Sequence, residues 1–184
     1  MQHSGTTVLE TLRLTLRPFK VEDADAMFRN WANDDEVTKY LTWPTHTSVE
    51  VSRYVLNDWV PRYVENDYYH WAIVPRELGE PVGSMAVVHK DDKAEMAHIG
   101  YGIGKKWWNR GITSEALAAV IRYLFTEVGY NRIESRHDPR NPNSGRVMQK
   151  CGMKYEAIHR EADWNNQGIC DLAMYAILKR EYAG

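Results

Sequence analysis

Cysteine is scarce in this sequence, because Cys151 and Cys170 are the only two in 184 residues. Neither has the spacing of a metal site, and the seven histidines are scattered without an H-E-x-x-H pattern. We therefore expect no structural metal and no disulfide framework. Two reduced thiols in a core are typical of a cytoplasmic protein.

Long apolar runs and clustered charges are also missing. No segment approaches the ~20 apolar residues of a membrane span, and MQHSGTTVLE lacks the cationic and apolar stretches of a secretory signal. The 23 Lys and Arg residues against 25 Asp and Glu give a net charge of −2, whereas a nucleic-acid surface needs clustered cations. We expect neither a membrane nor a nucleic-acid partner, and a cytoplasmic location.

The patterning that is present predicts a single α/β domain over residues 1–184. Alternating and short apolar runs predict strands at about 12–17, 69–74, 81–88, 96–103, 133–137, 154–159 and 169–178. Helical periodicity predicts helices at about 24–31, 48–60, 114–128 and 144–150. The order β-α-α-β-β-β-α-β-α-β-β implies a mixed sheet with helices on both faces.

The segment between residues 103 and 115 is the strongest candidate for a ligand site. A strand enters it and Gly111 stands where the long helix begins, so free backbone N–H groups and the helix dipole favour an anion such as a pyrophosphate. Lys105, Lys106 and Arg110 add cations. The alternative is an ordinary turn at Gly111 with Thr113 or Ser114 as N-cap. A Walker loop is excluded because no Lys-Ser/Thr follows the glycine, and the Rossmann fingerprint is absent.

Several ordered motifs between about Leu12 and Leu178 resemble those of GNAT acetyltransferases. They are L-R-L-T-L-R-P, N-D-D-E-V-T-K-Y-L-T-W-P-T-H-T, I-G-Y-G-I, W-W-N-R-G-I-T-S-E-A, R-H-D-P-R-N-P-N-S-G-R-V-M-Q-K-C-G-M and I-C-D-L-A-M-Y. Within that superfamily the chain is most similar to bacterial ribosomal-protein N-terminal-alanine acetyltransferases. The resemblance implies a sheet whose central strands splay apart, and transfer of acetyl from acetyl-CoA to a primary amine. It also implies an oligomer, with a homodimer as the expectation.

The resemblance assigns the acetyl-CoA site to two strand–helix junctions. The backbone of Tyr101, Gly102 and Ile103 is expected to bond the pantetheine, as are the side chains of Asn141 and Ser144. The pyrophosphate is expected on Trp108, Asn109, Arg110, Gly111, Ile112, Thr113 and Ser114. The family's loop commonly reads Arg/Gln-x-x-Gly-x-Gly/Ala, so only Gly111 is kept, and Asn109 stands where a second glycine often occurs.

Acetyl transfer needs a neutral amine, a polarised thioester carbonyl and a proton for the leaving thiolate. Met148 replaces the tyrosine acid of many GNAT enzymes, so the resemblance points to Ser144 as thiolate partner, although Ser144 and Asn141 also suit a helix N-cap. The resemblance places Asp163 as base. The further candidates for that role are Glu161, Glu95, His137 and His159. A backbone N–H near Gly100 or Tyr101 is expected to polarise the carbonyl.

The acceptor amine is left open by the sequence. Trp43, His46, Trp164 and Asn165 are candidates to line its pocket, and aromatic packing under a loop is the alternative. An α-amine has a pKa near 8 against about 10.4 for an alkyl amine, so it needs less help to become neutral. A protein N-terminus, a polyamine and an aminoglycoside all remain open, as do a silent acyl-CoA-binding module and a purely structural domain.

Overall fold

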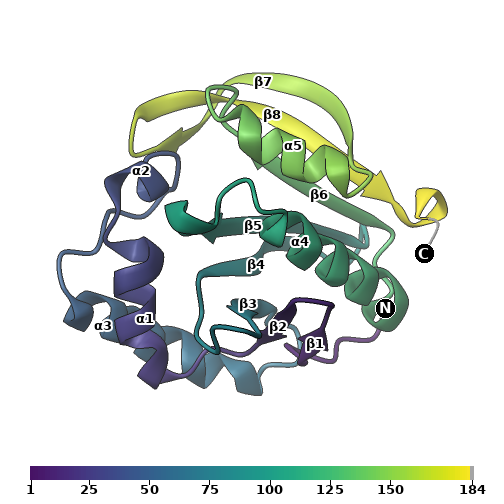
Figure 1. Ribbon diagram of the computed structural model, residues 1–184. Helices are drawn as coiled ribbons and strands as arrows, with labels where there is room; N and C mark the ends of the chain where they lie inside the picture. The colour runs from purple at the N-terminus through teal and green to yellow at the C-terminus, as the bar shows by residue number, and fades with distance from the viewer. Residues whose placement is uncertain (183–184) are drawn as a thin grey trace.

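The computed structural model describes residues 1–182 and contains one eight-stranded sheet in the order β1-β2-β3-β4-β5-β6-β8-β7. The strands are β1 (Leu9–Glu10), β2 (Leu14–Arg17), β3 (His70–Pro75), β4 (Gly83–Asp91), β5 (Met96–Ile103), β6 (Arg132–His137), β7 (Lys154–Asn165) and β8 (Gly168–Leu178). β5 and β6 are parallel, and the other neighbours are antiparallel. The predicted mixed α/β sheet is confirmed (Figure 1).

Five α-helices and several shorter helical turns accompany this sheet in the described chain. The α-helices are α1 (Ala24–Met27), α2 (Asp35–Thr38), α3 (Val49–Trp59), α4 (Ile112–Tyr123) and α5 (Pro142–Lys150). π turns extend α1 through Phe28–Ala32 and α4 through Leu124–Val128. The 3-10 turns are Val21–Asp23, Val60–Val64, Lys105–Trp107 and Lys179–Glu181. None of the helices in residues 1–182 combines the length and apolarity needed to cross a bilayer.

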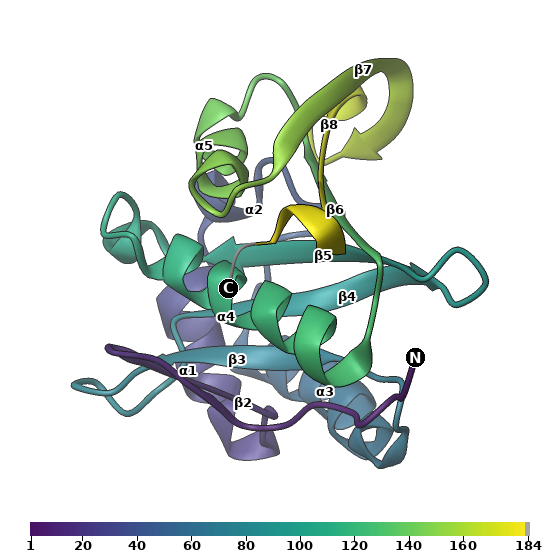
Figure 2. The same cartoon turned by 90° about the vertical axis from the view of Figure 1, so that its right-hand side faces the viewer.

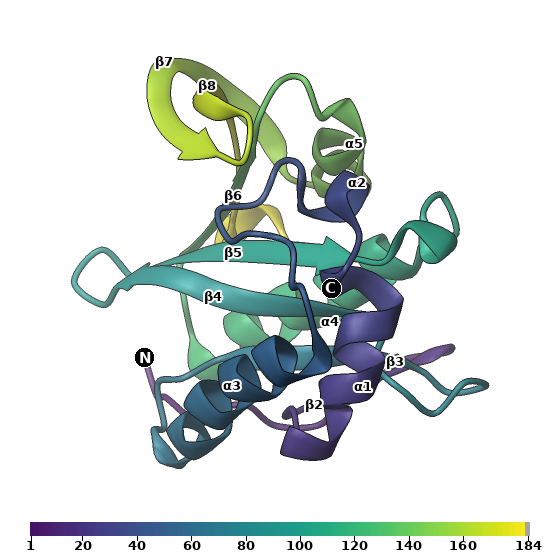
Figure 3. The ribbon, with the colours of Figure 1, turned by 90° about the vertical axis from the view of Figure 1, so that its left-hand side faces the viewer.

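Helices cover both faces of the sheet. Figure 2 shows α4 in front of β3, β4 and β5, and Figure 3 shows α1 and α3 on the opposite side. All six residues of β3 are buried because both of its faces are covered. Trp71 and Ile73 pack into the cluster that includes α4, while Ala72 and Val74 pack into the cluster that includes α1 and α3. Burial of large apolar side chains on both faces of this strand stabilises the fold by ~1.5–3 kcal/mol each.

The two central strands separate partway along their length. β5 and β6 pair over Met96–His98 and Arg132–Glu134. At the next rung the buried Ser135 hydroxyl donates to the Ile99 carbonyl at 2.7 Å, and Figure 2 shows β6 turning away from β5. The rest of β5 pairs with β4 alone among the described strands, which leaves one edge of β5 open. The predicted splay of the central strand pair is therefore confirmed.

Some predicted boundaries were wrong for local reasons. The strand predicted over 12–17 begins only at Leu14, because Leu12 lies in the turn between β1 and β2 and is 91% exposed. The helix predicted over 24–31 ends at Ala32, and a separate short helix that was not predicted, α2, starts after Asp34, whose carboxylate caps the N–H of Glu36. β7 continues to Asn165 as one arm of a hairpin, six residues beyond the predicted end. Short or irregular elements such as these lack a periodic signal.

Candidate active site

A cavity of about 630 Å³ opens where β5 and β6 have separated. Its walls come from the end of β5, the loop into α4, the start of α5, and the segment of α2 through Leu41. The lining includes every predicted acetyl-CoA residue except Arg110. The fold thus brings the two segments that the motifs predicted, 101–114 and 141–144, to one cavity.

The loop before α4 has the backbone geometry of an anion site. Gly111 occupies the N-cap position of α4 with φ of 74°, and Asn109 is also left-handed with φ of 59°. Glycine adopts this conformation without strain, and asparagine tolerates it better than most residues. The open N-terminus of a twelve-residue helix then presents backbone N–H groups toward the cavity. Thr113 and Ser114 are inside the helix, so the alternative that either one caps it is wrong.

Hydrogen bonds from the side chains of Arg13 and Trp108 hold this loop in place. Arg13 donates through Nη1 to the Arg110 carbonyl at 3.0 Å and through Nε to the Glu115 carboxylate at 2.6 Å. Trp108 donates its indole N–H to the Ile103 carbonyl at 2.9 Å. Arg110 therefore contributes a carbonyl to the support of the loop rather than a side chain to the cavity lining. The role of Arg13 was not predicted from the sequence, although this residue lies in the first quoted motif.

The cavity lining carries an excess of positive charge. Its charged members are Lys39, Arg140, Arg146 and Lys150 against Glu36 alone. Glu36 is in turn paired with Lys105 at 2.6 Å. Such an excess attracts a polyanion to the cavity. No group of three or more potential metal ligands gathers within residues 1–182.

Ser144 is in direct contact with Tyr101 of β5 at the cavity wall. The Tyr101 hydroxyl donates to the Ser144 carbonyl at 2.9 Å, and the Ser144 hydroxyl donates to Tyr101 Oη at 3.1 Å. Burial raises the pKa of Tyr101, so its phenol keeps its proton near neutral pH. Asn141 occupies the N-cap position of α5 without a side-chain capping bond. Ser144 lies in the first turn of α5 and does not cap it, so of these two candidates only Asn141 is the N-cap residue.

Comparison with known proteins agrees with this geometry. Residues 13–154 match a family model described as an acetyltransferase (GNAT) domain. Over 176 residues, covering 96% of this chain and 98% of the relative, the sequence is 34% identical to a Bacillus licheniformis protein named "Uncharacterized N-acetyltransferase p20". The chain belongs to the GNAT acetyltransferase family.

Two further relatives of this GNAT acetyltransferase are named for ribosomal proteins. The [ribosomal protein uS5]-alanine N-acetyltransferase of Escherichia coli is 34% identical over 64 residues, which cover 35% of this chain and 33% of that protein. A solved structure of RimL, described as a ribosomal L7/L12 alpha-N-protein acetyltransferase in complex with coenzyme A, has a TM-score of 0.83. It is 19% identical and the match covers 94% of this chain and 98% of that one.

The carboxylate predicted as base lies outside the cavity lining of this GNAT protein. The Asp163 carboxylate forms an ion pair with Arg136 Nη2 at 3.1 Å, which links β7 to β6. Among the alternatives, Glu95 is in the turn before β5, and Glu161 and His159 are exposed on β7. His137 packs against α5 and donates through Nδ1 to the Asp138 carbonyl at 2.8 Å. None of these five side chains lines the cavity, and the role of Asp163 stays a prediction.

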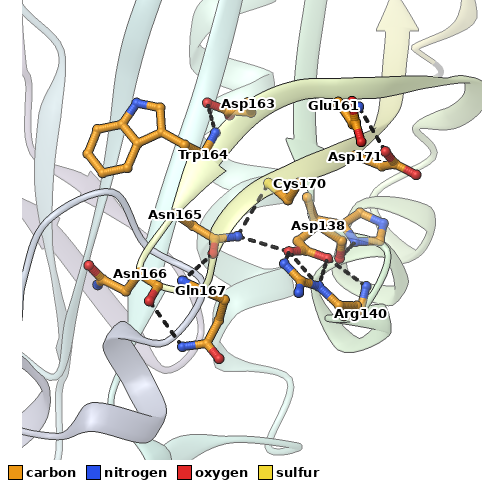
Figure 4. A network of polar contacts seen from close by, with 11 residues as sticks. Asp138, Arg140, Glu161, Asp163, Trp164, Asn165, Asn166, Gln167, Cys170 and Asp171 are labelled. Carbon is orange, nitrogen blue, oxygen red and sulfur yellow. Dashed lines mark hydrogen bonds and ion pairs between the residues drawn. The ribbon is translucent and has the colours of Figure 1, made fainter.

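The four residues predicted for the acceptor pocket do not gather in the cavity either. His46 is buried, bonds through Nδ1 to Ser52 at 2.7 Å, and has its pKa lowered by burial. Trp43 packs against its ring at 5.2 Å. Trp164 is 57% exposed and points away from the polar cluster in Figure 4. For Trp43 and His46 the alternative of packing under a loop is therefore the one observed.

Asp138 is the centre of a buried polar cluster that the sequence analysis missed (Figure 4). Its side chain, 2% exposed, accepts from Arg140 at 2.5 Å and from the Asn165 amide at 2.9 Å. Burial acts to raise the pKa of Asp138, but these bonds outweigh it and lower the pKa to about 2. Arg140 is thereby fixed at the cavity wall. Asp138 and Arg140 lie in a quoted motif, but only the fold shows that Asn165, at the end of β7, bonds to Asp138.

The tip of the β7–β8 hairpin is bonded to the opposite wall of the cavity. Asn166 donates through Nδ2 to the carbonyls of Thr38 and Trp43, at 2.9 and 2.8 Å. Its backbone N–H donates to the Leu41 carbonyl at 3.1 Å. The two adjacent asparagines therefore connect the hairpin to both sides of the cavity mouth.

Proposed function

We propose that this N-acetyltransferase binds acetyl-CoA in the 630 Å³ cavity and acetylates the α-amine of a protein N-terminus. The observation that carries the cofactor site is the loop before α4, with left-handed Gly111 and Asn109 at an open helix N-terminus inside a cation-rich lining. The open edge of β5 beside it supports a pantetheine that pairs with the strand. Coenzyme A bound to RimL, a protein of the same fold, agrees with this assignment.

The charge of the cavity lining favours an α-amine as acceptor over a polyamine or an aminoglycoside. A polycation needs free carboxylates, but Glu36 is the one carboxylate of the described cavity lining and it is paired with Lys105. An α-amine carries at most one charge and is partly neutral at pH 7. It therefore places a smaller demand on a site without a strong base. The naming of two relatives for ribosomal proteins makes a ribosomal-protein N-terminus the first candidate.

The chemistry then needs little from the protein besides position and hydrogen bonds. The amine nitrogen bonds to the thioester carbon, the C–S bond breaks, and the electron pair stays on sulfur. The Ser144 hydroxyl, at the cavity wall, is proposed to donate a hydrogen bond to this leaving thiolate, which takes its proton from solvent. The nitrogen releases its proton through water toward Asp163, the predicted base.

A thiol-release assay with matched acceptors tests this function. Peptides with free N-terminal alanine or serine are compared with the same peptides formylated at the N-terminus, with spermidine, and with an aminoglycoside. We expect release of coenzyme A with the free peptides and at least tenfold less with the others. Faster turnover of spermidine or the aminoglycoside would overturn the acceptor proposal. Absence of calorimetric binding of acetyl-CoA would overturn the cofactor site.

A further inference from the structure

Tyr101 bridges the opening between β5 and α5. It lies on β5 beyond the last rung that β5 shares with β6, and its hydroxyl reaches the first turn of α5, 43 residues later in the sequence. Tyr101 and Ser144 both line the cavity. The residue thus joins the two walls where a thioester would lie under the proposed function, on which the following inference rests.

We propose that Tyr101 is a positioning residue whose hydroxyl sets the direction of the Ser144 hydroxyl for the leaving thiolate. The Tyr101 Oη atom is 2.9 Å from the Ser144 carbonyl and 3.1 Å from Ser144 Oγ. Both distances are within hydrogen-bonding range, so the phenol proton has two acceptors within reach. Tyr101 is also the one hydrogen-bond partner of Ser144 Oγ among the described residues.

The hydroxyls of Tyr101 and Ser144 carry one proton each, and this limits which hydrogen bonds Tyr101 can donate. In the resting arrangement the phenol donates to the Ser144 carbonyl and accepts from the Ser144 hydroxyl. When sulfur accepts from the serine, the phenol turns its proton to Ser144 Oγ. The serine then donates to sulfur while it accepts from tyrosine, and each bond polarises the other. The phenol keeps its own proton throughout, so Tyr101 orients the serine and supplies no proton to the reaction.

A double-mutant cycle tests whether Tyr101 acts through Ser144. We expect Tyr101→Phe to lower kcat about three- to tenfold, the loss expected from one net hydrogen bond, with little change in the KM for acetyl-CoA. In the Ser144→Ala background the same substitution should change kcat less than twofold, and in the Ser144→Thr background it should cost as much as in the wild type. Tyr123→Phe is the matched control, because Tyr123 donates to the Gly5 carbonyl away from the cavity. It should leave kcat within a factor of two.

Equal losses from Tyr101→Phe in the wild-type and Ser144→Ala backgrounds would overturn the inference while leaving the proposed function intact. No turnover of any amine by the wild type would overturn both. Should Tyr101→Phe fail to fold, 3-fluorotyrosine placed at position 101 of the full chain gives a second readout. Its ¹⁹F resonance should move on Ser144→Ala, and an unmoved resonance would contradict the bond on which the inference depends.

Discussion

A glutamate at position 111 would place a negative charge where the structure forms its anion site. Gly111 is the left-handed N-cap of α4, and a Cβ built there meets Arg13 Nη2 at 3.4 Å, an ordinary contact. Substitution by Glu or Gln costs the same backbone strain, ~1–2 kcal/mol. The difference between Gly111→Glu and Gly111→Gln therefore isolates the charge. We expect only the glutamate to weaken binding of coenzyme A strongly.

The size of the effect follows from electrostatics at the cavity wall. Two like charges ~6 Å apart repel by about 1–3 kcal/mol for effective dielectric constants between 80 and 20. Pairing of the new carboxylate with Arg13 offsets up to ~1 kcal/mol of this, because Arg13 is half-exposed and already bound to Glu115. These two effects together leave ~0–3 kcal/mol, and the middle of that range, ~1–2 kcal/mol, raises the Kd for coenzyme A roughly 5- to 30-fold.

Thermal melting with and without coenzyme A measures this change. Ligand at 100 times the Kd of Gly111→Gln stabilises that variant by ~2.7 kcal/mol, and the same concentration stabilises Gly111→Glu by ~0.9–1.8 kcal/mol. At 2–4 °C per kcal/mol for a domain of this size, the ligand-induced rise in Tm is about 2–7 °C smaller for the glutamate. Gly79→Glu is the control for location, since Gly79 has φ of 73° and nothing within 4 Å of its Cβ position. Equal ligand-induced rises for Gly111→Glu and Gly111→Gln would refute the assignment of the loop.

Three other substitutions test the surroundings of the cavity. The pKa of Asp138 is lowered to about 2, so its ionised form stabilises the fold above pH ~4 and that contribution is lost as the pH falls toward 2. Asp138→Asn should therefore lower the free energy of unfolding by about 2 kcal/mol at pH 7 and by less at pH 3 in urea titrations; an equal loss at both would contradict the pKa. Asp163→Asn should lower kcat at least tenfold with little change in the KM for acetyl-CoA; an unchanged kcat with a lower Tm would show that Asp163 only pairs with Arg136. Gly145→Ala should destabilise the protein by ~1–3 kcal/mol, because its Cβ would lie 2.5 Å from His137 Nε2; an unchanged Tm would show that the His137 ring can move.

Regular periodicity and one constrained glycine explain most of what the sequence analysis predicted correctly. The strands from β3 to β6 and the helix α4 have strong patterns, and their predicted boundaries differ from the observed ones by a few residues. Gly111 was singled out because it stands at the start of a helix, and the structure has it at the N-cap of α4 with φ of 74°. The remaining loop residues followed from motif resemblance, and the cavity lining contains all of them except Arg110.

The sequence by itself determined the family, the mixed sheet and the segments around the cavity, because each depends on neighbours in the chain. Tertiary structure alone decided that Tyr101 meets Ser144, that Asn165 holds Asp138, and that Arg13 supports the loop. These partners are 43, 27 and 97 residues apart. Such pairs form where the packing of strands and helices brings distant backbones together. Local sequence patterns do not predict that packing. The contacts that orient the polar groups could therefore be identified only from the tertiary structure.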